Sequence, residues 1–171
     1  MCAAFQGKQM TTDTETTFND FALDERILAA VTKLGFTEPT PIQVEGIPVL
    51  LEGNDVIGGA RTGSGKTAAF GLPLVELAKN GDGVCKGLVL APTRELARQV
   101  CDALNTFATE LNISIEVMYG GVAYQGQLAA LRRGVDIVVG TPGRTLDHIK
   151  RGNLDVSAVQ MFVLDEADEM L

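Results

Sequence analysis

The pattern of hydrophobic and polar residues predicts a polar N-terminal segment and two short helices before strands and helices begin to alternate. Residues 1–17 are polar and rich in threonine, and we predict a flexible leader there. Between residues 24 and 34 the apolar side chains recur with the helical period, and Gly35 follows the last of them. A second short helix is predicted over residues 42–50, although Pro48 interrupts its pattern.

From residue 55 onward, short β-rich runs alternate with helix-like segments. The predicted strands are 55–58, 87–91, 113–119, 136–140 and 161–164, and the predicted helices are 66–79, 94–110, 122–133 and 143–151. Several strand runs (LVLA, IVVG, MFVL) are almost entirely apolar, which is typical of strands covered on both faces. The alternation predicts an α/β fold with a parallel sheet and helices on both faces, and ligands bind such sheets beyond the carboxyl ends of the strands.

The run ARTGSGKT, residues 60–67, lies between the first of these strands and the next helix, where a phosphate-binding loop belongs. Gly63 and Gly65 allow successive backbone N–H groups to face phosphate oxygens. Lys66 adds positive charge for the β- and γ-phosphates, and Thr67 offers a hydroxyl to Mg²⁺. Alanine stands where the strict GxxxxGKT pattern has its first glycine, and a glycine-rich turn without a ligand is the alternative.

A group of carboxylates follows the last predicted strand. Asp165, Glu166 and Asp168 come directly after the run MFVL, at the sheet edge where the phosphate loop is also expected. Asp165 suits holding Mg²⁺, and Glu166 suits orienting or deprotonating an attacking water. The alternative is a helix start decorated with acidic residues, which the helix dipole favours.

Composition and charge narrow the class of protein. A chain of 171 residues with 46% hydrophobic and 21% charged residues is typical of one globular domain, and its apolar runs are too short to span a membrane. The net charge is −8, yet residues 61–160 carry eleven basic and nine acidic side chains, so a nucleic-acid surface there is not excluded. The three cysteines lack metal-binding spacing, and we predict a reducing, cytoplasmic location.

Six short motifs occur in a fixed order along the chain. They are PTPIQ, ARTGSGKT, PTRELA, GG, TPGR and DEAD, beginning at residues 39, 60, 92, 120, 141 and 165. Residues 18–171 thereby resemble the N-terminal RecA-like domain of DEAD-box ATP-dependent RNA helicases, with greatest similarity to the bacterial cold-shock and ribosome-assembly members. The resemblance implies a RecA-like P-loop NTPase fold, ATP and Mg²⁺ as cofactors, RNA as partner, and RNA-stimulated ATP hydrolysis that unwinds or remodels duplexes.

The same resemblance assigns nucleotide-binding residues. Gln43 would pair with the adenine edge, to which its amide offers one donor and one acceptor, while Phe36 and the upstream Phe18 would lie at the ring. Without the resemblance, Phe36 reads as a core residue and Gln43 as a surface residue. The full nucleotide set is Phe18, Phe36, Gln43, Arg61, Thr62, Gly63, Ser64, Gly65, Lys66 and Thr67. Catalysis is assigned to Lys66, Asp165 and Glu166, and metal binding to Thr67 and Asp165; Asp168 would contact another motif.

Three further segments resemble the RNA-gripping motifs of the family. They comprise Pro92, Thr93, Arg94, Gly120, Gly121, Thr141, Pro142, Gly143 and Arg144. Arginines can pair with phosphates, threonines supply hydroxyls, and glycines permit close approach of the backbone, so contact with RNA is expected to be independent of sequence. Taken singly, each segment also reads as an ordinary turn with a helix cap.

The chain departs from the family pattern in three respects. Gly59 and Arg61 stand where glutamine is usual, and Glu38 stands where a basic residue is common. The predicted domain, 18–171, is incomplete at its C-terminus, because the Ser-Ala-Thr motif and the second RecA-like domain with its arginine fingers are absent. We therefore expect this chain alone to bind ATP without RNA-stimulated hydrolysis.

Two other readings remain open at this point. One is a DNA translocase or another P-loop ATPase, and the other is a non-catalytic module that binds nucleotide and RNA. ATP turnover in the presence of RNA distinguishes the last from an enzyme. No function is assigned to His148, the single histidine.

Overall fold

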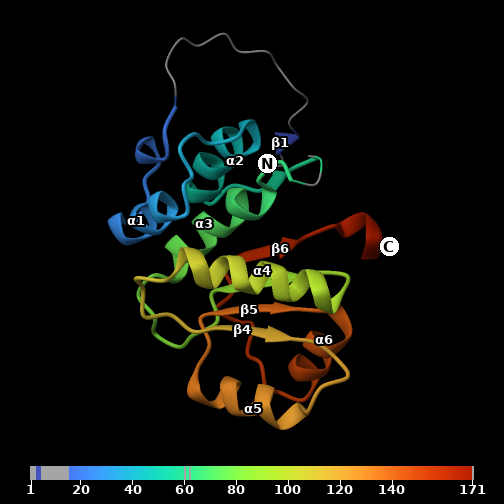
Figure 1. Cartoon of the computed structure of the whole chain (residues 1–171). Helices are drawn as coiled ribbons and strands as arrows, with labels where there is room; N and C mark the ends of the chain where they lie inside the picture. The colour runs from blue at the N-terminus through green and yellow to red at the C-terminus, as the bar shows by residue number, and fades with distance from the viewer. Residues whose placement is uncertain (1–2, 5–15, 60, 62, 171) are drawn as a thin grey trace.

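The computed structural model describes residues 3–4, 16–59, 61 and 63–170 (Figure 1). Helices and strands alternate from residue 56 onward, as the hydrophobic pattern predicts. The elements are β1 (Ala3–Ala4), η1 (Phe18–Asp20), α1 (Glu25–Lys33), α2 (Pro41–Leu51), β2 (Val56–Ile57), α3 (Lys66–Ala78), β3 (Gly87–Leu90), α4 (Arg94–Phe107), β4 (Ile115–Met118), α5 (Tyr124–Arg133), β5 (Ile137–Gly140), α6 (Pro142–Lys150), β6 (Met161–Leu164) and η2 (Ala167–Met170).

Four of the strands form one parallel sheet in the order β4-β5-β3-β6. The sequence predicts that the strand before the phosphate loop joins this sheet, but β2 pairs in parallel with β1 instead. Among the described residues, no strand lies between β2 and β6 to join the two sheets. A cavity of about 1110 Å³ separates these two strands instead. The predicted leader contributes β1, while residues 1–2 and 5–15 lie outside the described part of the chain.

Helices cover both faces of the four-stranded sheet, as predicted. Alternate residues of a strand point to opposite faces, and Val89 and Val139 pack in a core with residues of α1, α3 and α4. Their neighbours Leu88 and Val138 pack in a second core with residues of α5 and the segment after α6. Figure 1 shows α1, α2 and α3 on one side of the sheet and α5 and α6 on the other.

The last strand departs from the expectation that it is covered on both faces. Phe162 and Leu164 of β6 have 55% and 51% of their surface exposed, whereas Met161 and Val163 pack against the main core. This part of the prediction is wrong, because β6 is an edge strand of the sheet and the cavity beside β2 leaves one of its faces uncovered.

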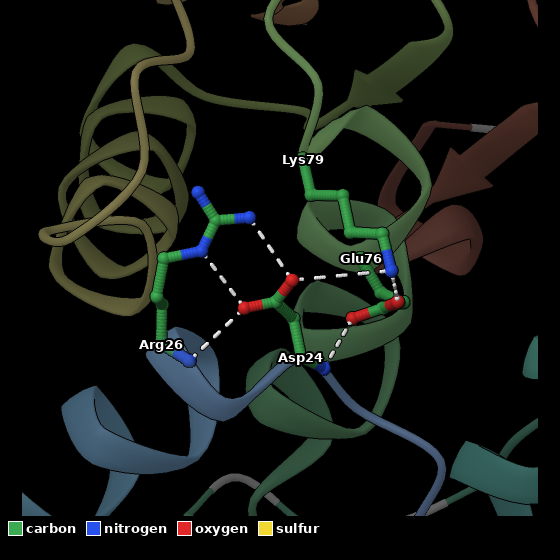
Figure 2. A network of polar contacts seen from close by, with 4 residues as sticks. All are labelled: Asp24, Arg26, Glu76 and Lys79. Atoms are coloured by element: carbon green, nitrogen blue, oxygen red, sulfur yellow. Dashed lines mark hydrogen bonds and ion pairs between the residues drawn. The ribbon is translucent and has the colours of Figure 1, made fainter.

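A network of polar contacts joins the first helix to the helix of the phosphate loop (Figure 2). Asp24 caps α1 by accepting a hydrogen bond from the backbone N–H of Arg26, at 3.0 Å, and its carboxylate also accepts from the Arg26 guanidinium. The backbone N–H of Asp24 donates to Glu76 on α3 at 2.7 Å, and Lys79 lies 4.0 Å from the Asp24 carboxylate. The start of α1 is thereby fixed against α3.

Within the described ranges, none of the helices has both the length and the apolar character needed to cross a lipid bilayer.

Candidate functional site

The carboxyl ends of the four paired strands meet at one edge of the sheet, because all four are parallel. β3 ends at Leu90, two residues before Pro92, and β6 ends at Leu164, directly before Asp165. β4 and β5 likewise end before the Gly-Gly turn and the TPGR segment. The predicted RNA and metal residues that follow these strands therefore lie at this edge, where parallel sheets bind ligands.

The phosphate loop leads directly into α3, whose first residue is Lys66. Gly63 and Gly65 have φ values of 81° and 88°, in the left-handed region that favours glycine. The Ser64 hydroxyl is buried and has no hydrogen-bond partner among the described residues. A left-handed turn, a helix N-terminus and a lysine form a donor set that fits nucleotide phosphates. Thr62 and Ala60 of this run lie outside the described residues.

Gln43 connects the predicted adenine segment to the phosphate loop. Its side chain is 3% exposed, so reading it as a surface residue is wrong. Its Nε2 donates to the Gly65 carbonyl at 3.1 Å, and its Oε1 accepts from the Thr40 backbone N–H at 2.9 Å. One amide hydrogen and one oxygen lone pair remain for a ligand. The pairing of Gln43 with adenine stays a prediction.

The two predicted adenine-side phenylalanines lie together. The rings of Phe18 and Phe36 have centroids 6.0 Å apart, and Phe36 also meets Phe107 of α4 edge-on at 6.4 Å. Phe18 belongs to the main core, whereas Phe36 is 38% exposed. Phe36 therefore has open surface for a ring to stack upon, and Phe18 supports it from the protein side.

The predicted catalytic residues line the cavity between β2 and β6. Lys66, Asp165 and Glu166 all contribute to its wall, and so does Asp168, which is predicted to contact another motif. Burial raises the pKa of Asp165 above its ordinary value; the charge of Lys66 opposes this rise and that of Glu166 adds to it. A cation beside Asp165 would keep it ionised.

The chemistry of these groups fits Mg²⁺. This ion is usually held by one or two carboxylates together with substrate phosphates rather than by a full protein cage. Asp165 supplies a carboxylate in the wall of the cavity, and Thr67 lies in the first turn of α3, directly after Lys66. Glu166 has a φ of 52°, uncommon for a residue other than glycine and frequent at functional sites.

A second cavity, of about 680 Å³, brings together the three predicted RNA segments. Its wall is formed by Pro92, Thr93, Arg94, Glu95, Gly120, Thr141, Gly143, Arg144 and Asp147. We call this cavity the basic-turn groove. The predicted residues that are not part of this wall are Gly121 and Pro142, each adjacent in sequence to one that is.

Close packing holds the first two of these segments together. Gly121 has a φ of 81°, and a Cβ placed on it would lie 2.6 Å from the Arg94 guanidinium. A side chain at this position would therefore displace the Arg94 guanidinium from its place over the turn. Thr93 caps α4 by accepting from the backbone N–H of Leu96 at 3.2 Å, so this segment is also an ordinary helix cap.

Arg144 belongs to a group of contacts between α5 and α6. Its guanidinium donates to the Gln127 side chain at 2.9 Å and lies 5.2 Å from the centroid of the Tyr124 ring. His148 is fully buried beside both, and its pKa is lowered chiefly by burial and secondly by the charge of Arg144. From the sequence alone, we predict no role for Tyr124, Gln127 or His148. Tyr124 and Gln127 are three residues apart on α5, and Arg144 and His148 are four apart on α6, so each pair shares one face of its helix. This spacing is the only sign of the contact that the sequence contains.

Comparison with known proteins now decides the family. The DEAD/DEAH box helicase family matches residues 40–171. This chain belongs to the DEAD/DEAH box helicase family. A DEAD box protein from the hyperthermophile Methanococcus jannaschii has a similar crystal structure, with a TM-score of 0.85 and 47% identity over 90% of this chain and 42% of that one. The α/β fold predicted from the alternating pattern, and the RecA-like fold that the resemblance implies, are thereby confirmed.

Relatives named ATP-dependent RNA helicase DeaD are similar in sequence to this chain over most of its length. Those from Klebsiella pneumoniae and Escherichia coli (strain K12) are each 56% identical over 92% of this chain. A hypothetical ATP-dependent RNA helicase from Sulfolobus tokodaii has a TM-score of 0.80 and 40% identity over 86% of this chain and 43% of that one. The chain spans about a quarter of the length of the DeaD relatives it matches.

Proposed function

We propose that this chain is the ATP- and RNA-binding part of an ATP-dependent RNA helicase that unwinds or remodels RNA duplexes. One observation carries the proposal. The carboxylates after β6 line a cavity with Lys66, and the turns after β3 and β5 line the basic-turn groove at the same sheet edge. A nucleotide and an RNA strand would therefore bind at neighbouring positions.

In the nucleotide cavity, each group has a distinct task under this proposal. Backbone N–H groups of the phosphate loop and the Lys66 ammonium bind the β- and γ-phosphates. Thr67 and Asp165 hold Mg²⁺, which supplies charge neutralisation at the phosphates when bound. Glu166 orients or deprotonates the attacking water.

In the basic-turn groove, guanidinium, hydroxyl and glycine backbone groups suit phosphate and sugar rather than base edges. We propose that Arg94 and Arg144 pair with phosphates of a single strand, independently of sequence. The acidic Glu95 and Asp147 in the same wall limit the net positive charge and favour modest affinity.

The remaining parts of the proposal concern what lies around this chain. Because the matched relatives are about four times longer, we propose that a second RecA-like domain supplies an arginine finger to the γ-phosphate. We also propose a cytoplasmic location, supported by the free and buried thiols of Cys85 and Cys101.

Separate removal of each charge tests the two sites. Lys66→Ala should nearly abolish ATP binding measured by calorimetry and leave RNA binding unchanged, because the loop loses its lysine charge. Arg94→Ala should weaken the binding of labelled single-stranded RNA, measured by anisotropy, and leave ATP binding unchanged. Lys150→Ala and Arg132→Ala, both exposed and outside the two cavities, are the matched controls. Unchanged ATP affinity in Lys66→Ala would remove this residue from the site.

A further inference from the structure

A buried glutamine joins two of the three segments that line the basic-turn groove. Gln127 of α5 has 9% of its surface exposed. Its Nε2 donates at 3.1 Å to the carbonyl of Tyr119, the residue before the Gly-Gly turn. Its Oε1 accepts at 2.9 Å from Nη1 of Arg144 in the TPGR segment. One side-chain amide thus fixes the end of β4 relative to the arginine of α6.

The partners of this amide settle its orientation. With the amide reversed, an NH₂ group would face the Arg144 guanidinium, donor against donor, and an oxygen would face the Tyr119 carbonyl. His148 Nε2 lies 3.0 Å from the same Gln127 oxygen and is completely buried. The neutral imidazole therefore carries its hydrogen on Nε2, and Gln127 accepts from two donors while donating to a third group.

Tyr124, three residues before Gln127 on α5, supports the same arginine. Its ring stacks on His148, with centroids 4.4 Å apart and planes at 17°. The Arg144 Cζ atom lies 5.2 Å from the Tyr124 centroid, within the range of a cation–π attraction. Arg144 is therefore held by a hydrogen bond and by an aromatic ring while it still lines the groove.

We propose that Gln127, together with Tyr124, is a positioning residue that orients Arg144 toward an RNA phosphate. This inference rests on the proposed contact between Arg144 and RNA. A free arginine side chain loses rotamer freedom when it binds a phosphate, whereas one already fixed by its neighbours loses less, so RNA affinity rises. Gln127 acts through Arg144 and does not itself touch RNA.

The test replaces the amide by a side chain of similar length. In this chain, Gln127→Met removes the hydrogen bonds to Arg144, to His148 and to the Tyr119 carbonyl. Affinity for single-stranded RNA, measured by anisotropy, should fall roughly tenfold, since a hydrogen bond to a charged group is lost. ATP affinity should stay unchanged. Gln125→Met, at an exposed position of the same helix, is the matched control and should stay within about twofold of the parent.

A double-substitution cycle separates this inference from the function on which it rests. If Gln127 acts through Arg144, then Gln127→Met should cause no further loss in an Arg144→Ala background. Additive losses of RNA affinity would overturn the positioning role while leaving the RNA contact of Arg144 intact. No loss of affinity in Arg144→Ala alone would instead overturn the proposed contact, and the inference with it.

A second pair of variants serves if Gln127→Met does not fold, as judged by thermal unfolding. Tyr124→Leu removes the ring beside Arg144, whereas Tyr124→Phe keeps it and loses only the hydroxyl contact with Asn153. The leucine variant should bind RNA more weakly and the phenylalanine variant should match the parent. Equal RNA affinity in both variants and the parent would contradict the proposal.

Discussion

A single methyl group at Gly65 should impair the nucleotide site more than its size suggests. Gly65 is the N-cap of α3 and has a φ of 88°, and an added Cβ would collide with the Gln43 amide. The left-handed conformation costs a residue with a side chain about 1–2 kcal/mol, and the lost hydrogen bond from Gln43 costs about 1 kcal/mol. Gly65→Ala should therefore disfavour the observed loop by about 2–3 kcal/mol.

Because that loop shape is the one we propose for phosphate binding, ATP affinity should fall by roughly 30- to 150-fold. Calorimetry with ATP and Mg²⁺ measures the loss. Gly126→Ala is the matched control, since the position is helical and, apart from its chain neighbours and the backbone of its own helix, no atom lies within 4 Å of the added Cβ. This control should keep its ATP affinity. A Gly65→Ala affinity within about threefold of the parent, well below the calculated loss, would refute the assignment of this loop to phosphates.

Three further predictions address the adenine segment, the α1–α3 network and the RNA groove. Gln43→Ala should weaken ATP binding more than GTP binding in calorimetry. Equal losses of affinity would mean that Gln43 only stabilises the phosphate loop and does not bind adenine. Asp24→Ala should lower the free energy of unfolding by about 1 kcal/mol at pH 7, through loss of the helix cap. Hydrogen bonds from Arg26 hold the pKa of Asp24 below its ordinary 3.8, so this difference should shrink in thermal unfolding as the pH falls below that value; a constant difference would contradict it. RNA affinity should fall about sevenfold between 50 and 200 mM salt if two arginines contact phosphates, and a log–log slope steeper than about −4 would require a larger basic surface.

The sequence was sufficient to predict most of the fold because the strands are short, apolar and separated by helices with a clear period. β3 and β5 are buried on both faces, so their composition matched their environment. The separation of β2 from the main sheet could not be predicted in this way. Strand pairing depends on partners distant in sequence, and the run MFVL of β6 resembles a central strand although it lies at an edge.

The residues of the candidate site likewise fall into those that local sequence predicts and those that depend on distant contacts. Lys66, Gly65 and Asp165 could be identified because loop chemistry and position after a strand are local features of the sequence. The contacts of Gln127 with Arg144 could not, because they require α5 and α6 to pack together in a known register. The burial of Gln43 was likewise missed, since its partner Gly65 is 22 residues away.

The most direct test of the central claim is phosphate release from ATP with and without single-stranded RNA. It compares this chain with a protein extended through a second RecA-like domain, and with the Glu166→Gln variant of that longer protein. We predict ATP binding in all three, RNA-stimulated release only in the extended protein, and a loss of at least about 100-fold in Glu166→Gln. Release that RNA does not stimulate in the extended protein, or that survives in Glu166→Gln, would contradict the account.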